Sequence, residues 1–213
     1  MLQEVYEAQR QMGRPISSLV LMGIGEPLDN LPNVLAFLEI LCSEEGQQLG
    51  WRHVSLSTCG LIPGIRELMD KRLGLTLSIS LHAPDDAARS AIMPVNRSYP
   101  IGELMAVCRE YFAATGRRVS YEYALIDGVN DSPEQAAALA RLLKGQTCHV
   151  NLIPVNPVAE RATRRSSRAA VERFARRLGQ LGGNATVRRE LGSDIAAACG
   201  QLRRQSAASP EEA

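Results

Sequence analysis

The sequence predicts an α/β fold in which parallel strands form a sheet and helices cover its outer side. Two observations carry this prediction. Short apolar runs of strand length alternate with longer segments whose apolar residues recur at helical spacing, a pattern typical of β–α–β units. The strand-like runs number about five or six, too few for an eight-stranded barrel and suited to a smaller, partly open one.

The expected elements follow one another regularly along the chain. Residues 1–10 are charged and amphipathic and predict a helix rather than a signal peptide, because no continuous apolar stretch follows them. The strand-like runs are 19–22, 54–57, 75–80, 119–126, 150–153 and, more weakly, 186–189. Because a helix comes first, we expect the first strand of the repeat to be missing from this sequence. We expect residues 1–202 to form one core, followed by a disordered tail over 203–213.

Helical patterns lie between these runs. The residues that share one helical face are Val34, Leu38 and Leu41; Ile62, Ile65, Leu68 and Met69; Leu104, Cys108, Tyr111 and Phe112; and Val171, Phe174, Leu178 and Leu181. A further helix is expected to begin at Ser132, which has Pro133 after it and Gln135 three residues on, and to end at Gly145.

Composition bounds the class of protein. Hydrophobic residues make up 45% and charged residues 22% of the 213 residues, close to globular averages, and no apolar run is long enough to span a membrane. The five cysteines are scattered and form no CxxC pair, which argues against a zinc site or a disulfide framework and favours the cytoplasm.

Charge leaves two interpretations open. The net charge of +1 indicates nothing about nucleic acid, but arginines crowd the region from 161 to 189. Arginine suits bidentate contacts with phosphate, so this region is either a phosphate-binding surface or a solvated helix face.

Polar residues follow five of the strand-like runs. These strand ends are 23–27, 57–60, 80–84, 127–131 and 154–157. In parallel α/β folds, ligands bind at the carboxyl ends of the strands. Each cluster alone is a turn signal, but five at one rim predict a binding site.

Several residues at this rim have chemistry suited to a ligand. Gly25 permits close approach of the backbone. Glu26 offers a carboxylate to an amino group, or acts as a charge at a helix N-terminus. Ser57 and Ser80 can bond a carboxylate or a ribose hydroxyl, or cap turns. His82 is the only histidine at a strand end, and a lone histidine is weak evidence for a metal.

Two further candidates lie towards the end of the chain. Asn156 stands between two prolines and could bind an adenine edge. Cys199 follows an alanine run, and the sequence leaves open whether it is a thiolate. Cys59 and Cys148 are expected to be small buried residues.

Five ordered segments carry a resemblance to a known family. They are 22–28 (MGIGEPL), 56–60 (LSTCG), 78–84 (SISLHAP), 151–157 (NLIPVNP) and 197–202 (AACGQL). In order and spacing they resemble the motifs of the RlmN/Cfr family of radical S-adenosylmethionine (SAM) RNA methyltransferases. The resemblance runs to about Leu202 and implies an incomplete (β/α)6-type radical SAM barrel whose first strand is missing.

The resemblance implies a mechanism and a set of site residues. SAM would be bound by Gly25, Glu26, Ser57, Ser80, Leu81, His82 and Asn156. Cys199 would become S-methylcysteine, and a [4Fe–4S] cluster would cleave a second SAM to a radical that abstracts hydrogen from that methyl group. The implied substrate is carbon 2 of an exposed adenosine in 23S ribosomal RNA and transfer RNA, with a reductant such as flavodoxin.

One family motif is absent. No CxxxCxxC cluster motif occurs, and Cys42 and Cys108 lie on helix patterns away from the rim, so we expect no cluster ligands and no methylation by this chain alone. The alternatives are a non-catalytic SAM- or RNA-binding remnant, and methylation of carbon 8 instead of carbon 2. A third, disfavoured alternative is an unrelated barrel enzyme that uses His82 with carboxylates.

Overall fold

The structure of the chain, a computed structural model, describes residues 1–155 and 164–188. Its centre is one sheet of six strands: β1 (Leu19–Leu21), β2 (Val54–Thr58), β3 (Thr76–Ser80), β4 (Val119–Leu125), β5 (Cys148–Pro154) and β6 (Ala185–Val187). The strands lie in sequence order and every neighbouring pair is parallel. Among the described residues β1 and β6 are the two edges, so the sheet is not closed, and the predicted α/β partial barrel is confirmed.

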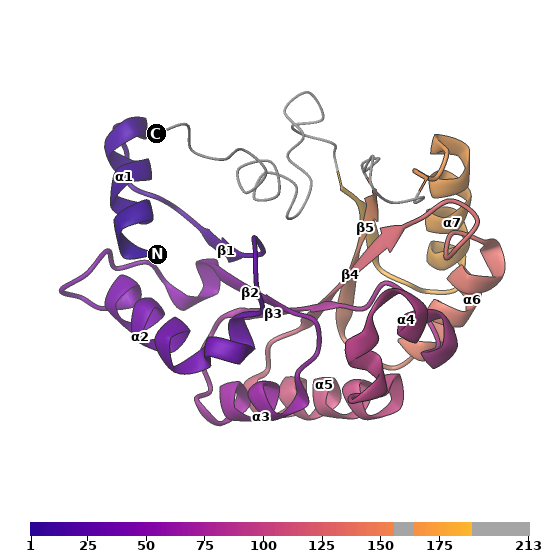
Figure 1. The fold of residues 1–213 in the computed structure, drawn as a ribbon, viewed down its shortest axis with the longest axis horizontal. Coiled ribbons are helices and arrows are strands. Elements are labelled where there is room, and N and C mark those ends of the chain that lie inside the picture. The colour runs from indigo at the N-terminus through magenta and orange to yellow at the C-terminus, as the bar shows by residue number, and fades with distance from the viewer. Residues whose placement is uncertain (156–163, 189–213) are drawn as a thin grey trace, which may run out of the picture.

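The helices lie around the outer side of this sheet (Figure 1). They are α1 (Leu2–Met12), α2 (Leu31–Cys42), α3 (Ile62–Asp70), α4 (Asp86–Ile92), α5 (Ile101–Thr115), α6 (Pro133–Leu142) and α7 (Arg168–Gln180), with the short 3-10 helices η1 (Pro27–Asn30), η2 (Trp51–His53) and η3 (Pro94–Arg97). None of the helices in the part of the chain that the structure describes is long and apolar enough to cross a bilayer.

The two faces of the sheet differ sharply in polarity. The register of the strands places Leu56, Leu77, Tyr121 and Val150 on the outer face, where all four are fully buried against the helices. The inner face carries polar residues instead. From β2 to β6 they are Ser55, Ser57, Thr76, Ser78, Ser80, Ser120, Glu122, His149, Asn151 and Thr186. Strands of parallel sheets are normally apolar on both faces, so this polar inner face indicates a place for a ligand.

The predicted helix starts and stops are largely confirmed. At α6 the Ser132 hydroxyl accepts from the Gln135 amide, and the Gln135 side chain accepts from the Ser132 amide, which completes the predicted capping box. The helix ends at Leu142, three residues before Gly145, which adopts a positive φ of 79° in the following turn. The expected tail over 203–213 lies outside the described residues.

Helix α4 is an element that the sequence did not predict. Its seven residues, DAARSAI, carry no apolar stripe. The helix begins instead at Asp85, whose carboxylate accepts a hydrogen bond from the Ala88 amide at 2.8 Å.

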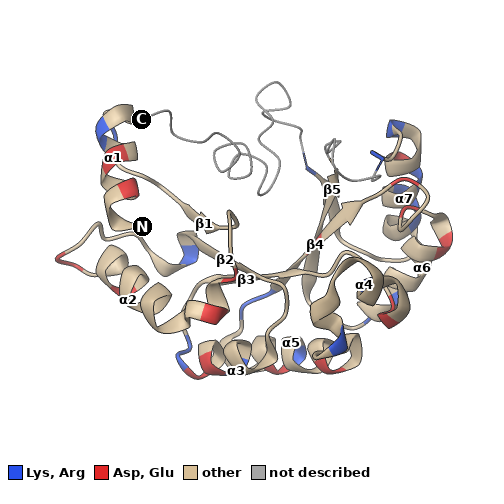
Figure 2. Ribbon diagram, viewed as in Figure 1, with Lys and Arg blue, Asp and Glu red and all other residues tan. Residues whose placement is uncertain are grey.

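The charged residues of Figure 2 concentrate on the outer helices, which is where solvated side chains are expected.

Candidate functional site at the strand ends

Glu26 joins the ends of the first two strands. One carboxylate oxygen, Oε2, accepts from the amide of Cys59 at 2.7 Å, and Oε1 accepts from the amide of Leu28 at 3.1 Å. The second of these bonds caps η1, so the interpretation of Glu26 as a charge at a helix N-terminus is observed. Because each carboxylate oxygen can accept more than one hydrogen bond, Glu26 retains capacity for a ligand ammonium group.

Gly25, beside it, leaves the backbone accessible. It has a positive φ of 89°, a conformation that favours glycine, and a Cβ built there would meet no atom within 4 Å. The predicted close approach of a ligand to this turn is therefore sterically possible.

Ser57 and Ser80 lie on the inner face, both partly buried. Ser57 is the register partner of Ser78, and Ser80 is that of Glu122. Within the described part of the chain neither hydroxyl is used in a side-chain hydrogen bond, so both are available to a ligand.

The turn after β3 holds His82 in a defined state. The amides of Leu81 and His82 both donate to the carbonyl of Glu122, at 3.0 and 3.3 Å. The ring Nδ1 of His82 accepts from the amide of Ala124 at 3.0 Å. Burial, helped by the charge of Arg89, lowers the pKa of His82 to about 4. The imidazole is therefore neutral at pH 7 with its proton on Nε2, which makes it a hydrogen-bond donor.

Arg89 is a residue of this site that the sequence reasoning missed. It is fully buried, and its guanidinium donates to the carbonyls of Cys59 (2.6 Å), Ser80 (3.1 Å) and Leu81 (3.1 Å). The same group donates to Asn96 Oδ1 at 3.0 Å. Arg89 therefore links the carboxyl ends of β2 and β3 through its guanidinium, which reaches them from α4.

Asn130 performs a similar task at the end of β4. Its amide donates to the carbonyls of His82 (2.7 Å) and Ala124 (2.6 Å), and its Oδ1 accepts from the amide of Ile126 at 2.7 Å. Asn130 is fully buried. The sequence placed it in a polar strand end suited to a ligand, but its three side-chain bonds show that it stabilises the turn.

Glu122 is the second missed residue, and a signal for it existed. Its carboxylate lies on the inner face in the middle of β4, with only 6% of the residue exposed. Burial raises its pKa, and the hydrogen bond from Asn151 opposes that shift. The alternation Val119-Ser120-Tyr121-Glu122-Tyr123 marks a strand with one polar face, which could have predicted this position.

The described cysteines do not fit an iron–sulfur cluster. Cys42 lies on α2, Cys108 on α5, Cys59 after β2 and Cys148 at the start of β5, and none is paired. Burial raises the pKa of all four thiols, to about 12 for Cys59 and Cys108. No group of three or more metal-ligating side chains occurs among the described residues. The expectation that Cys42 and Cys108 lie on helices is confirmed.

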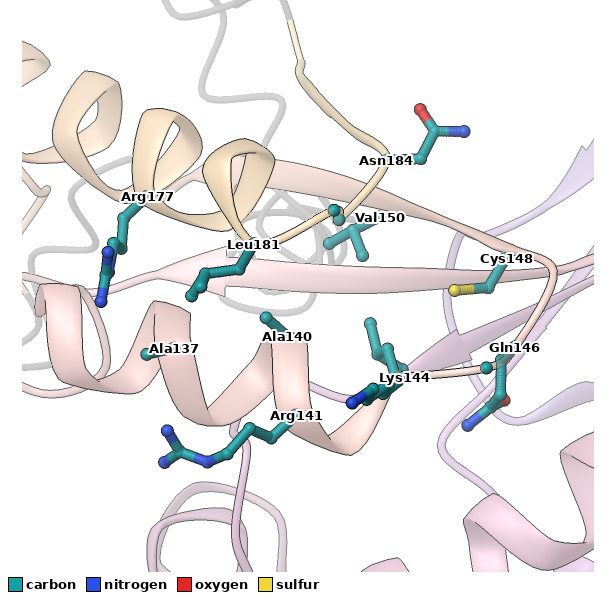
Figure 3. A pocket seen from close by; sticks show the side chains of 14 residues that line it. Ala137, Ala140, Arg141, Lys144, Gln146, Cys148, Val150, Arg177, Leu181 and Asn184 are labelled. Atoms are coloured by element: carbon teal, nitrogen blue, oxygen red, sulfur yellow. The ribbon is translucent and has the colours of Figure 1, made fainter.

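A separate cavity of about 480 Å³ lies between α6 and α7, at the opposite ends of the strands (Figure 3). Arg141 and Lys144 line it from α6 and the turn that follows, Arg177 from α7 and Cys148 from the start of β5. None of the predicted site residues within the described part of the chain lines this cavity. Asn156 and Cys199, two of those predicted residues, lie outside the described part of the chain.

The sheet is parallel and partly open, its inner face is polar, and groups that can bond a ligand lie at the carboxyl ends of its strands. These features together indicate a class of protein. The chain matches the Radical SAM superfamily over residues 2–140, and it belongs to that superfamily. A domain of a pyruvate-formate lyase-activating enzyme from Bacteroides vulgatus has the same fold, with a TM-score of 0.63 over 82% of this chain and all of that domain at 19% identity.

Within the superfamily the chain is similar to RlmN proteins, which confirms the resemblance. It is 53% identical over 203 residues to the probable dual-specificity RNA methyltransferase RlmN of Clostridium perfringens (strain SM101), and 55% identical over 205 residues to that of Pelotomaculum thermopropionicum. A crystal structure of a radical SAM methyltransferase from Sphaerobacter thermophilus superposes with a TM-score of 0.89 at 48% identity over 94% of this chain.

These matches cover the chain far more completely than they cover the relatives. They span 95% and 96% of this chain but only 58% and 56% of the two RlmN proteins, and 58% of the Sphaerobacter chain. The activity, substrates and partners of the whole relatives are therefore not transferred by similarity alone.

Proposed function

We propose that this chain forms the SAM-binding core of an RNA methyltransferase that modifies carbon 2 of adenosine in 23S ribosomal RNA and in transfer RNA, in the cytoplasm. The observation that carries the proposal is the rim itself. Gly25, Glu26, Ser57 and the turn from Ser80 to His82 lie at three neighbouring strand ends, in a chain about half identical to proteins named RlmN.

Each described residue has a task that fits SAM. The free acceptor capacity of Glu26 suits the ammonium of the methionine part, and Gly25 lets that part approach the backbone. The hydroxyls of Ser57 and Ser80 and the Nε2 proton of His82 supply neutral hydrogen bonds to carboxylate or ribose oxygens. We propose Asn156 as a contact to the adenine of SAM.

We propose that Cys199 receives the methyl group. Carbon 2 of adenine is electrophilic and cannot attack a sulfonium, whereas a thiolate can. The Cys199 sulfur would form a bond to the methyl carbon of SAM while the bond from that carbon to the sulfonium breaks. The electron pair stays on the departing sulfur, which leaves S-adenosylhomocysteine and S-methylcysteine.

A [4Fe–4S] cluster, with an electron from a donor such as flavodoxin, would supply the radical chemistry that activates this methyl group. The described residues of this chain include no set of ligands for such a cluster. We therefore assign none of them to it. The possibility that the chain binds SAM or RNA without catalysis is retained as an outcome of the test below.

The test is nucleoside mass spectrometry of RNA from cells that lack their own enzyme and receive a full-length RlmN gene in which this chain, with or without Cys199→Ala, replaces the segment that it matches, since no methylation is expected from this chain alone. We expect 2-methyladenosine with the unsubstituted chain and none with Cys199→Ala. A matched control is Cys148→Ala, which replaces a partly buried thiol whose pKa is raised. This control should retain the modification.

Three results would contradict the proposal in different ways. Methylation that persists in Cys199→Ala would overturn the role of that cysteine. Appearance of 8-methyladenosine would move the reaction to carbon 8. No modified adenosine with the unsubstituted chain in the full-length gene, in the presence of SAM binding, would favour the non-catalytic alternative.

A further inference from the structure

A line of four polar side chains crosses the inner face of the sheet, from His149 on β5 to Thr186 on β6, back to Asn151 on β5 and on to Glu122 on β4. His149 Nε2 lies 3.0 Å from Thr186 Oγ1, Thr186 Oγ1 lies 3.3 Å from Asn151 Oδ1, and Asn151 Nδ2 lies 2.8 Å from Glu122 Oε1. Glu122, Asn151 and Thr186 are register partners on three adjacent strands. The backbone pairing of the sheet therefore aligns these three side chains, and His149 joins the line from two residues earlier on β5.

The hydrogen bonds in this line all point the same way. Thr186 has one hydroxyl proton, and it donates that proton to Asn151 Oδ1, so Thr186 can only accept from His149. This assigns the proton of His149 to Nε2. The amide of Asn151 then donates to Glu122. Every donor is thus directed towards the carboxylate of Glu122, which is the final acceptor.

One of the two carboxylate oxygens of Glu122 receives no hydrogen bond from the described residues. Oε1 accepts from Asn151, whereas no described residue donates to Oε2. Oε2 is not among the buried side-chain atoms that lack a partner in the described part of the chain, so water can reach it and a donor of a bound ligand can take the place of that water. The group that completes this site should therefore carry a hydroxyl or an amine.

The position of Glu122 narrows the choice of ligand. It lies at the level of Ser80, its register partner on β3, so the two side chains offer adjacent contacts in one layer of the inner face. Glu122 is 6% exposed and lies below the rim, which favours a small ligand over a polymer. Two adjacent contacts fit the two neighbouring hydroxyls of a ribose, and carboxylates bind ribose hydroxyls in other nucleotide sites.

We propose that Glu122 accepts a hydrogen bond from a ribose hydroxyl of SAM, and that Asn151, Thr186 and His149 position its carboxylate for that bond. The inference rests on the proposed function only in its choice of SAM as ligand. Among the described residues, it adds side chains of β4, β5 and β6 to a site otherwise built from the ends of β1 to β3.

The test is calorimetric titration of the protein, purified anaerobically in the form that cells produce, with S-adenosylhomocysteine and with its 2′-deoxy and 3′-deoxy analogues. Glu122→Gln should weaken S-adenosylhomocysteine about tenfold or more, the usual effect of a lost hydrogen bond to a charged group. The same variant should lose much less affinity for the deoxy analogue that lacks the contacted hydroxyl. That difference is a double-mutant cycle between residue and ligand, and a general loss of structure would not produce it.

Two further variants sharpen the experiment. Thr186→Val interrupts the line at an exposed position of an edge strand, where misfolding is least expected, and should weaken binding a few-fold. Glu103→Gln replaces an exposed carboxylate of α5 and should leave the affinity unchanged.

The outcomes separate this inference from the proposed function. Equal affinity of Glu122→Gln and the natural protein, or an equal loss for all three ligands, would overturn the inference, as would failure of the natural protein to bind S-adenosylhomocysteine. A hydroxyl-dependent loss together with no RNA methylation would sustain the inference and sink the proposed function instead.

Discussion

At the scale of single residues, His82 shows how burial sets the chemistry of the rim. Its φ of 59° lies in the left-handed region, which is uncommon for any residue other than glycine. The turn holds this conformation because the ring nitrogen, the amide and the carbonyl of His82 are all hydrogen-bonded. The sequence marked His82 as a rim residue, but only the structure shows that it is neutral.

This neutral state predicts a dependence of stability on pH. The pKa of His82 is lowered to about 4 in the folded protein, whereas an unfolded histidine titrates near ~6.5. Between these values the unfolded chain binds more protons, so the contribution is fully present above about pH 6.5 and is lost as the pH falls towards 4. The full difference corresponds to about 3 kcal/mol in the free energy of unfolding.

Urea unfolding between pH 7.5 and 4.5 measures this dependence, with His82→Asn as the test variant. Asparagine tolerates a positive φ and offers an acceptor for the Ala124 amide, so we expect it to fold and to show a flatter dependence. His53→Asn, at an exposed position, should behave like the natural protein. An unchanged slope in His82→Asn would show that His82 does not titrate as described.

At the scale of elements, α4 is held to the sheet by a buried charge. Arg89 reaches from this seven-residue helix to the carbonyls after β2 and β3. On its other side Asn96 links it to Asp86, whose Oδ1 accepts from Asn96 at 2.9 Å. Burial lowers the pKa of Arg89, but a guanidinium remains protonated in proteins. Each of its N–H donors therefore needs a hydrogen-bond acceptor.

We predict that Arg89→Lys lowers the free energy of unfolding by about 2–4 kcal/mol, because an ammonium cannot reach four acceptors that a planar guanidinium bonds together. Denaturant unfolding measures the change. Arg66→Lys is the matched control, since Arg66 pairs with Glu110 at 2.6 Å but both side chains are about half exposed. That exposed pair should contribute less than about 1 kcal/mol. Equal effects of the two substitutions would refute the role given to Arg89.

The elements also show where sequence reasoning succeeds. All six strands and most helices follow from local patterns, because apolar spacing and capping residues act within one element. Helix α4 was missed because its anchor is Arg89, a charged residue whose acceptors lie 8 to 30 residues away in sequence. Contacts at such separations leave no periodic signal.

At the scale of the whole molecule, the residues that stabilise the fold and the residues that can bind a ligand lie on opposite faces of the sheet. The helices lie outside the sheet (Figure 1) and form the core with its outer face, whereas the inner face carries polar side chains. The rim could be predicted because the carboxyl ends of parallel strands must meet. The alternation in β4 could have predicted the inner-face position of Glu122, but not the line of side chains that ends on it, because that alignment depends on the register of three strands.

The central claim is that SAM binds on this inner face at the strand ends. Hydrogen–deuterium exchange of the backbone amides, with and without SAM, tests it most directly. We predict slower exchange in 23–28, 57–60 and 80–83, and no change around the cavity between α6 and α7, at 141–146 and 181–184. Slower exchange confined to that cavity, or none at the strand ends at saturating SAM, would contradict the account.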